Sequence, residues 1–145
     1  MALHPVLRPA TCADLDYITG LKERTMRPAL ERLGRWSPRR SRARVEAALA
    51  AGGVSIVEVD GAPVGSIAWT RDDDAWHLHL FYLEPARHGA GLGSELLRSG
   101  LAAHPGTVRL EVLRGTRSRS LYERFGFTLV RSDEVDDFLH LVRNG

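Results

Sequence analysis

The sequence has a single cysteine, Cys12, among its 145 residues. One cysteine cannot form an intramolecular disulfide, and it excludes a zinc site built from several thiolates. Long apolar runs are also missing, because no stretch approaches the roughly 20 residues of a membrane-spanning helix and residues 1–10 lack the apolar centre of a signal peptide. We therefore expect a cytoplasmic protein without a membrane partner.

A large excess of one charge is absent too. Twenty lysines and arginines against 18 aspartates and glutamates give a net charge of +2, which is too small to argue for a nucleic-acid partner. The apolar share of 43% and the charged share of 26% are ordinary for a globular protein, and the length suits a single domain over residues 1–145.

Arginine is nevertheless concentrated in one segment, at Arg35, Arg39, Arg40, Arg42 and Arg44. Such a run is most often the solvated face of a helix, with binding of phosphate or of an acidic partner as the alternative. We take the solvated face as the expectation.

Apolar periodicity and turn residues predict the order of the elements. An edge strand over Val6–Pro9 precedes a helix that Thr11 caps, and a second helix runs from Ser41 to Gly52. The remaining expected elements are strands at Val54–Val59, Val64–Thr70 and Trp76–Leu83, a helix from Leu92 to Leu101, a strand at Val108–Val112, a short helix that Thr116 caps and Gly126 ends, and strands at Phe127–Val130 and Phe138–Val142. Asp60-Gly61 is a strong hairpin signal between the first two of these strands. The order indicates an α+β (mixed α/β) fold with helices on both faces of one sheet.

The segment that follows the strand ending at Leu83 is rich in glycine. It reads Pro85-Ala86-Arg87-His88-Gly89-Ala90-Gly91-Leu92-Gly93-Ser94. Glycines placed where a strand gives way to a helix leave backbone amides free to face an anion at the helix N-terminus, so we interpret this segment as a pyrophosphate cradle. A plain tight turn is the alternative.

Two segments resemble the signature motifs of the GCN5-related N-acetyltransferase (GNAT) superfamily. The first motif, Gln/Arg-x-x-Gly-x-Gly/Ala, aligns with His88, Gly91 and Gly93. The second motif contains Asn and Ala and ends in Leu-Tyr-x-x-x-Gly-Phe; it aligns with Thr116, Leu121, Tyr122, Gly126 and Phe127. Two such segments about thirty residues apart in the expected elements are far more specific than a glycine loop alone.

Three residues depart from these motifs. His88 stands where the family usually has Gln or Arg, Thr116 where it has Asn, and Ser118 where it has Ala. A histidine can still donate through a ring N–H, so we expect His88 to keep a phosphate-binding role.

The resemblance implies a central, mostly antiparallel twisted sheet and transfer of an acetyl group from acetyl-CoA (coenzyme A) to a primary amine by direct attack in a ternary complex. The amine belongs to a small molecule or a peptide, no metal is expected, and the chain could form a homodimer. The implied cofactor-binding residues are Leu83, through its backbone, and Pro85, His88, Gly89, Ala90, Gly91, Leu92, Gly93, Ser94 and Thr116.

Tyr122 is the candidate catalytic acid. It would protonate the departing thiolate, whose thiol pKa is about 8.5 by analogy with cysteine. Leu121 and Phe125 are expected to form the buried side of the short helix and to turn Tyr122 toward a splay between the strands. The alternative is that Tyr122 is a core aromatic.

A catalytic base must also remove a proton from the incoming ammonium, whose pKa is about 10. Glu111 is the first candidate, because its strand resembles one in ribosomal-protein N-acetyltransferases where a glutamate is assigned as the base. Glu84 and His79 are alternatives, and the solvated face of a strand is the other interpretation of Glu111. His77 and His79 share a strand face, but a metal bound there would lack its third ligand.

Two other functions stay open. A glycine-rich turn is compatible with a dinucleotide-binding oxidoreductase, although antiparallel strands and not a βαβ unit precede this loop. The replaced motif residues His88 and Thr116 keep open a non-catalytic acyl-CoA-binding sensor. Tyr122 favours an enzyme, because a binding module needs no acid.

Overall fold

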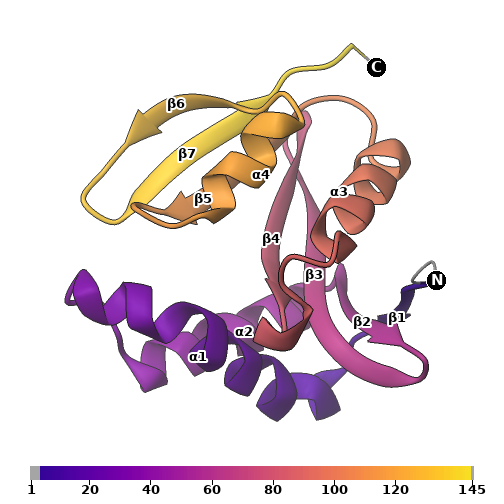
Figure 1. The fold of residues 1–145 in the computed structure, drawn as a ribbon, viewed down its shortest axis with the longest axis vertical. Helices are drawn as coiled ribbons and strands as arrows, with labels where there is room; N and C mark the ends of the chain where they lie inside the picture. The colour runs from indigo at the N-terminus through magenta and orange to yellow at the C-terminus, as the bar shows by residue number, and fades with distance from the viewer. Residues whose placement is uncertain (1–3, 145) are drawn as a thin grey trace.

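The fold is a mixed α/β domain, seen in a computed structural model that describes residues 4–144 (Figure 1). The strands are β1 (Val6–Pro9), β2 (Val54–Val59), β3 (Ala62–Asp72), β4 (Ala75–Leu83), β5 (Val108–Leu113), β6 (Thr128–Ser132) and β7 (Asp136–Leu141). The helices are α1 (Leu15–Arg32), α2 (Pro38–Ala51), α3 (Leu92–Ala103) and α4 (Ser118–Arg124), with 3-10 turns at Cys12–Asp14 and Pro85–Arg87. The predicted fold class is confirmed.

The strands form one sheet in the order β1-β2-β3-β4-β5-β7-β6. The β4–β5 pair is parallel and the other pairs are antiparallel. Between β2 and β3, Asp60 and Gly61 have φ angles of 53° and 79°, the left-handed values that a two-residue type I′ hairpin requires. The predicted hairpin is confirmed.

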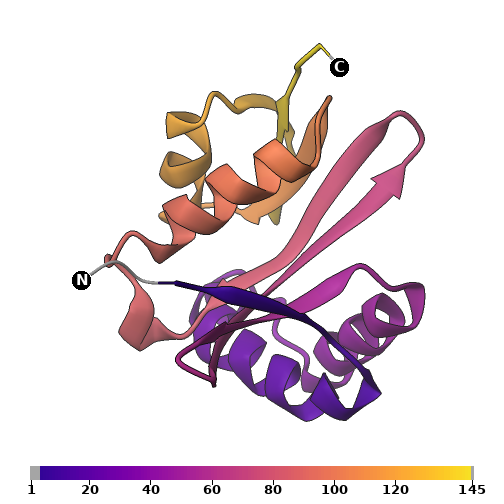
Figure 2. The same cartoon turned by 90° about the vertical axis from the view of Figure 1, so that its right-hand side faces the viewer.

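Helices cover both faces of the sheet (Figure 2). On one face, α3 packs an apolar stripe made of Leu92, Leu96, Leu97 and Leu101 into a core that also contains Tyr122 of α4. On the other face, Ile18 of α1 and Val45 of α2 pack against Ile56 and Ala68 of the sheet. Figure 2 shows β3 and β4 running between α3 and the pair of helices α1 and α2.

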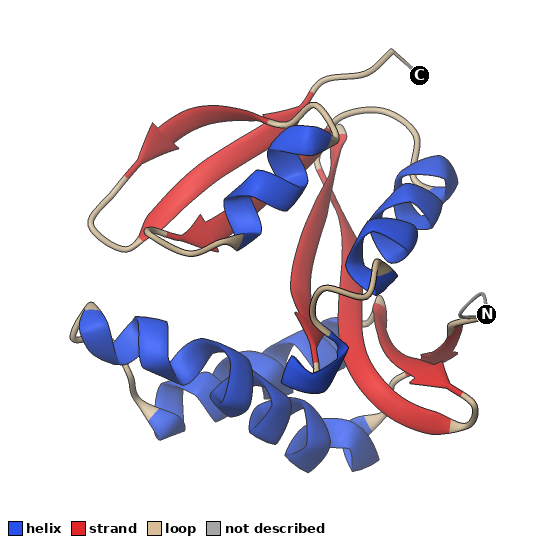
Figure 3. Ribbon diagram, viewed as in Figure 1, coloured by secondary structure: helices blue, strands red, loops and turns tan. Residues whose placement is uncertain are grey.

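Strands β4 and β5 separate soon after they meet. Their pairing covers two positions, Trp76 with Val108 and His77 with Arg109. Beyond these positions the two strands diverge, as Figure 3 shows. The edge of β4 that faces β5 is therefore free of a partner strand from Leu78 to Leu83 within residues 4–144.

A β-bulge in β4 lies next to this opening. The register of β4 against β3 shifts between Ser66 and Ala68, and Leu80 has a φ angle of 47°. The Ser66 hydroxyl donates a hydrogen bond of 2.6 Å to the Leu80 carbonyl and so holds the bulge. As a result Leu78 packs in the α3 core and Leu80 in the α1–α2 core, although residues two apart on a regular strand share a face.

The predicted start of α2 at Ser41 is wrong. The helix begins at Pro38, and the Ser37 side chain accepts a hydrogen bond of 3.3 Å from the Arg40 amide. Serine is a favoured N-cap, and proline suits the first helical position because its missing N–H would have no partner there.

The predicted capping role of Thr116 is also wrong. Helix α4 begins at Ser118 with Arg117 as its N-cap residue, and no side chain caps it. The Thr116 hydroxyl instead donates a hydrogen bond of 2.9 Å to the Leu113 carbonyl at the end of β5. This bond shapes the turn between β5 and α4.

Candidate active site

The glycine-rich loop joins β4 to α3 and leaves the start of α3 without a side-chain cap. Gly89 and Gly91 have φ angles of 80° and 82°, which residues with a side chain rarely adopt. The Glu95 amide donates to the Gly91 carbonyl at 3.1 Å, so the amides of residues 92–94 precede the helical hydrogen-bond pattern. Amides in this position, together with the helix dipole, bind anions.

A cavity of about 580 Å³ runs beside this loop, and we call it the loop cavity. Its lining comes from β4, the glycine loop and α4: Phe81, Leu83, Arg87, His88, Gly89, Gly91, Gly93, Ser94, Arg117, Ser118, Leu121, Tyr122 and Arg124. A Cβ atom built on Gly93 would lie 3.6 Å from the Leu83 and Leu121 side chains. The loop, the end of β4 and α4 therefore share one narrow space.

Arg117 and Arg124 line the loop cavity, although no sequence pattern predicts them as binding residues. Together with Arg87 they place positive charge around the helix N-terminus of α3. Their place in the sequence could have indicated a role at the site, because Arg117 precedes and Arg124 follows the Leu121-Tyr122 pair of the second motif.

The ring of His88 turns back toward β4. Its Nε2 atom lies 2.9 Å from the Leu83 carbonyl, and since a carbonyl only accepts, the ring donates this bond. The contact ties the loop to the end of β4. Pro85 opens the 3-10 turn before it, and Ala90 is exposed in the loop. The predicted phosphate contact of His88 stays a prediction.

Tyr122 is buried, with an exposed fraction of 6%. Its ring packs edge-on against Phe127 with the centroids 5.7 Å apart, and burial raises the pKa of its hydroxyl, which keeps the phenol protonated. The expectation that Leu121 and Phe125 form the buried side of α4 is wrong, because both are only partly buried. Tyr122 reaches the splay from the buried face of α4, since β4 and β5 have already diverged there.

A second cavity, of about 620 Å³, occupies the splay itself, and we call it the splay cavity. It reaches from Lys22 and Arg44 of α1 and α2 to Tyr122 of α4. It shares with the loop cavity Phe81, Leu83, His88, Ser118 and Tyr122. Tyr122 thus stands at the junction of the two cavities, and Thr116 lines the splay side.

Glu111 is not isolated in the splay cavity. Its carboxylate lies 2.7 Å from Nε2 of His77, and this contact raises the pKa of His77 and lowers that of Glu111. His79 stacks on His77 with the ring centroids 4.7 Å apart, and burial lowers its pKa to about 4. The pair of Glu111 and His77 can accept a proton as a unit, whereas His79 is neutral near pH 7.

Glu84 is held in a different environment. Its carboxylate accepts a hydrogen bond of 2.7 Å from the Tyr17 hydroxyl and two, of 3.0 and 2.9 Å, from the Arg24 guanidinium. These donors lower the pKa of Glu84. Glu84 lines neither the loop cavity nor the splay cavity, so its contacts fasten α1 to the end of β4.

The described part of the chain has neither a metal-binding cluster nor a membrane-spanning helix. No cluster of three or more His, Cys, Asp or Glu side chains there is arranged to hold a metal ion. None of the helices in residues 4–144 has the length and apolarity to cross a membrane.

A family model described as an acetyltransferase (GNAT) domain matches residues 50–129, more than half of the chain. The chain belongs to the GNAT acetyltransferase family. The match covers the hairpin, the glycine loop and the Tyr122 helix, and GNAT acetyltransferases are enzymes. No curated protein sequence matches the chain closely enough to show a relationship.

Solved structures support the GNAT fold over nearly the whole chain. A protein from Pyrococcus horikoshii has a TM-score of 0.78 at 20% identity, with 99% of each chain covered. The PaiA N-acetyltransferase from Thermoplasma acidophilum, in complex with coenzyme A, has a TM-score of 0.74 at 16% identity, with 98% of this chain and 99% of that chain covered. A GNAT family acetyltransferase from Brucella melitensis, in complex with acetyl-CoA, has a TM-score of 0.66 at 26% identity, with 98% and 90% covered.

Proposed function

We propose that this GNAT protein transfers an acetyl group from acetyl-CoA to a primary amine by direct attack in a ternary complex. One observation carries the proposal: the loop cavity and the splay cavity meet at Tyr122. The cofactor would lie in the first and the acceptor would enter through the second. The coenzyme A and acetyl-CoA complexes of two structural neighbours support this assignment.

The residues of the loop cavity fit the cofactor. The amides of residues 92–94 face an anion site that suits a pyrophosphate, and the guanidinium groups of Arg87, Arg117 and Arg124 surround it with positive charge. The unpaired edge of β4 near Leu83 offers backbone groups to an extended amide-containing arm, in the manner of an added strand. When bound, acetyl-CoA supplies an acetyl thioester that reacts with an amine.

Tyr122 would act on the leaving group. As the amine nitrogen forms its bond to the acetyl carbonyl carbon, the carbon–sulfur bond breaks and the sulfur needs a proton to leave as a thiol. The ordinary pKa of a tyrosine, about 10, already keeps the phenol protonated near pH 7, and burial raises the pKa of Tyr122 further. Its hydroxyl has no hydrogen-bond partner among residues 4–144, and the residue lines both cavities, so we assign it as the acid.

The pair of Glu111 and His77 would receive the proton that the amine loses. Glu111 orients the His77 ring through the 2.7 Å contact. The raised pKa of His77 is closer to the pKa of an amine than the pKa of a free carboxylate is. Glu84 is a weaker candidate for the base, because three donors already occupy its oxygens.

The cofactor assignment is tested at Gly93. A Cβ atom there meets only ordinary van der Waals contacts, so Gly93→Ala and Gly93→Val should fold while they obstruct the approach of the pyrophosphate to the amides. We expect calorimetry to show acetyl-CoA affinity reduced, and more strongly for valine. Ala102→Val, at an exposed position of α3, is the matched control and should bind normally.

The binding and turnover results distinguish between the functions that the sequence leaves open. Acetyl-CoA binding with release of free thiol in the presence of an amine supports the transferase. Binding of acetyl-CoA without acetylation of any amine would identify a sensor module. Unreduced acetyl-CoA affinity in both Gly93 variants would remove the pyrophosphate cradle from consideration.

A further inference from the structure

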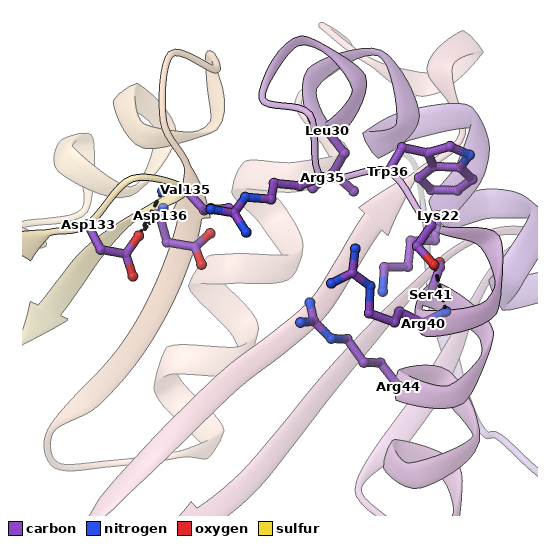
Figure 4. A pocket seen from close by; sticks show the side chains of 11 residues that line it. Lys22, Leu30, Arg35, Trp36, Arg40, Ser41, Arg44, Asp133, Val135 and Asp136 are labelled. Carbon is purple, nitrogen blue, oxygen red and sulfur yellow. Dashed lines mark hydrogen bonds between the residues drawn. The ribbon is translucent and has the colours of Figure 1, made fainter.

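A third cavity, of about 200 Å³, lies between α1, α2 and the turn that joins β6 to β7 (Figure 4). Lys22 of α1 and Arg40 and Arg44 of α2 line it on the helix side, and we call these three residues the cation wall. Figure 4 shows their side chains pointing into the cavity, with Asp133 and Asp136 on the facing side. The segment expected to be a solvated helix face therefore also lines a cavity.

Lys22 is the most unusual member of the cation wall. Only 6% of the residue is exposed, and its ammonium has no carboxylate or hydrogen-bond partner among residues 4–144. Burial and the neighbouring Arg44 guanidinium lower the pKa of Lys22 to about 8. Lys22 thus places a cation without a counter-ion at the wall of the cavity, an arrangement suited to a ligand that brings a negative charge.

The arginines of this region differ in their ion pairs, and Arg35 lines the cavity as well. Arg35 and Arg42 form ion pairs with Glu134 at 3.2 Å and with Asp16 at 2.8 Å. Arg40 of the cation wall has no ion pair within the described residues.

Two further groups in the cavity lack a protein partner. The Arg44 guanidinium, which belongs to the cation wall, has no ion pair in the described part of the chain. The Ser41 hydroxyl lines the same cavity and is fully buried without a hydrogen-bond partner. Donors that are unsatisfied by protein thus gather on this side of the cavity.

This cavity opens into the splay cavity. The two share Lys22, Leu30, Arg44 and Asp136, and the splay cavity continues to Glu111 and Tyr122. The Asp136 carboxylate lies on the shared wall, where a positively charged amine would be attracted. A single molecule can therefore contact the cation wall and reach Tyr122.

Resting on the N-acetyltransferase function, we propose that the acceptor is a primary amine that also carries a carboxylate or phosphate group. The anionic group binds Lys22, Arg40 and Arg44, and the amine passes Asp136 into the splay cavity. A polyamine would place a second positive charge against the cation wall, so like-charge repulsion disfavours it as the acceptor.

The acceptor class is tested with matched pairs of amines. 4-Aminobutanoate is compared with 1,4-diaminobutane, phosphoethanolamine with ethanolamine, and glutamate with its diamide, each with acetyl-CoA and with released thiol as the readout. We expect the anionic member of at least one pair to have a kcat/KM about 10- to 100-fold above that of its partner, the usual effect of a charge-assisted contact.

The site is tested with Lys22→Met, which keeps the length of the buried side chain, and with Arg44→Met, whose residue is exposed enough to leave folding intact. Both should raise KM for the anionic acceptor about 10- to 100-fold with kcat and acetyl-CoA affinity unchanged. Arg39→Met is the control, because Arg39 is exposed on α2 and lines neither cavity. It should leave KM unchanged.

The outcomes separate this inference from the function on which it rests. If wild-type protein fails to bind acetyl-CoA in calorimetry, both are wrong. If acetyl-CoA binds but the diamines are acetylated as well as the anionic amines, or neither variant changes KM, the transferase stands and the anionic acceptor is rejected. Failure to acetylate any anionic amine by a protein that binds acetyl-CoA rejects it as well.

Discussion

The loop cavity and the cation wall are both positively charged, but they are built differently. The loop cavity uses backbone amides at the start of α3 and exposed arginines at its rim. The cation wall uses a largely buried lysine that has no counter-ion within residues 4–144. Backbone amides at a helix end bind phosphate with little dependence on one side chain, whereas a buried ammonium selects strongly by charge. If the proposed function holds, we expect the loop cavity to bind the cofactor generally and the cation wall to select among acceptors.

The largest effect is expected at the junction of the two cavities. Tyr122→Phe should lower kcat about 10- to 1000-fold, the range of acid–base catalysis, because the departing sulfur loses its proton donor. Acetyl-CoA affinity and the melting temperature should change little, since the ring and its packing on Phe127 are kept. Steady-state kinetics and calorimetry measure both. A variant with full kcat, or one that loses activity in step with stability, would make Tyr122 a structural residue.

The loop cavity and the cation wall should respond separately to substitution. Gly93→Val should raise the KM for acetyl-CoA and leave the KM for the acceptor unchanged. Lys22→Met should raise the KM for the acceptor and leave the KM for acetyl-CoA unchanged. We expect each change to be about tenfold or more, because valine at position 93 obstructs the approach of the pyrophosphate to the amides and Lys22→Met removes a charge-assisted contact. Initial rates with one substrate varied at a time measure them. Equal changes in both KM values for both variants would mean that the two cavities do not hold separate ligands.

A smaller effect is expected from Glu111→Gln. The Glu111 carboxylate raises the pKa of His77, so its removal weakens the proton-accepting pair. Turnover should fall about tenfold, and most at low pH, where less of the amine is unprotonated and base assistance matters more. The pH–rate profile measures this. A profile with unchanged shape would shift the role of base to Glu84, His79 or bound water.

The smallest effect is expected from Glu84→Gln. Its ion pair with Arg24 is partly exposed, with 47% of the arginine side chain accessible, so its loss should cost about 1 kcal/mol or less. The pKa of Glu84 is lowered by folding, so this stabilisation is present above the ordinary value of 4.5 and is lost as the pH falls. Thermal melts of both proteins across pH should show the difference disappear in acid. A large fall in kcat with unchanged stability would instead assign Glu84 to catalysis.

Local sequence patterns were sufficient to predict part of the candidate site. The glycine loop was predictable because φ angles above zero at Gly89 and Gly91 and a helix start at Leu92 depend on residues within a few positions of each other. The same holds for the Asp60-Gly61 hairpin. Tyr122 was predicted as a site residue by its motif, but the packing of α4 was predicted wrongly, because periodicity over 7 residues does not tell which side meets a sheet.

Contacts between distant segments could not be predicted. The pairing of Glu111 with His77 depends on the register of β5 against β4, which brings residues 34 positions apart together. Lys22 reads in the sequence as an ordinary surface lysine of α1. Its burial appears only when α1 packs against α2 in the folded protein.

The sequence by itself determined the fold class, the hairpin, the glycine loop and the family motifs, because turns, caps and apolar periodicity act over short stretches of chain. Only the tertiary structure decided where β4 and β5 part and which charges face the space between them. The two residue pairs between β4 and β5 lie at one end of that opening, and the bulge at Leu80 lies along it. Residues of six elements, α1, α2, β4, β5, α4 and β7, line it, and no local pattern predicts how such distant segments meet.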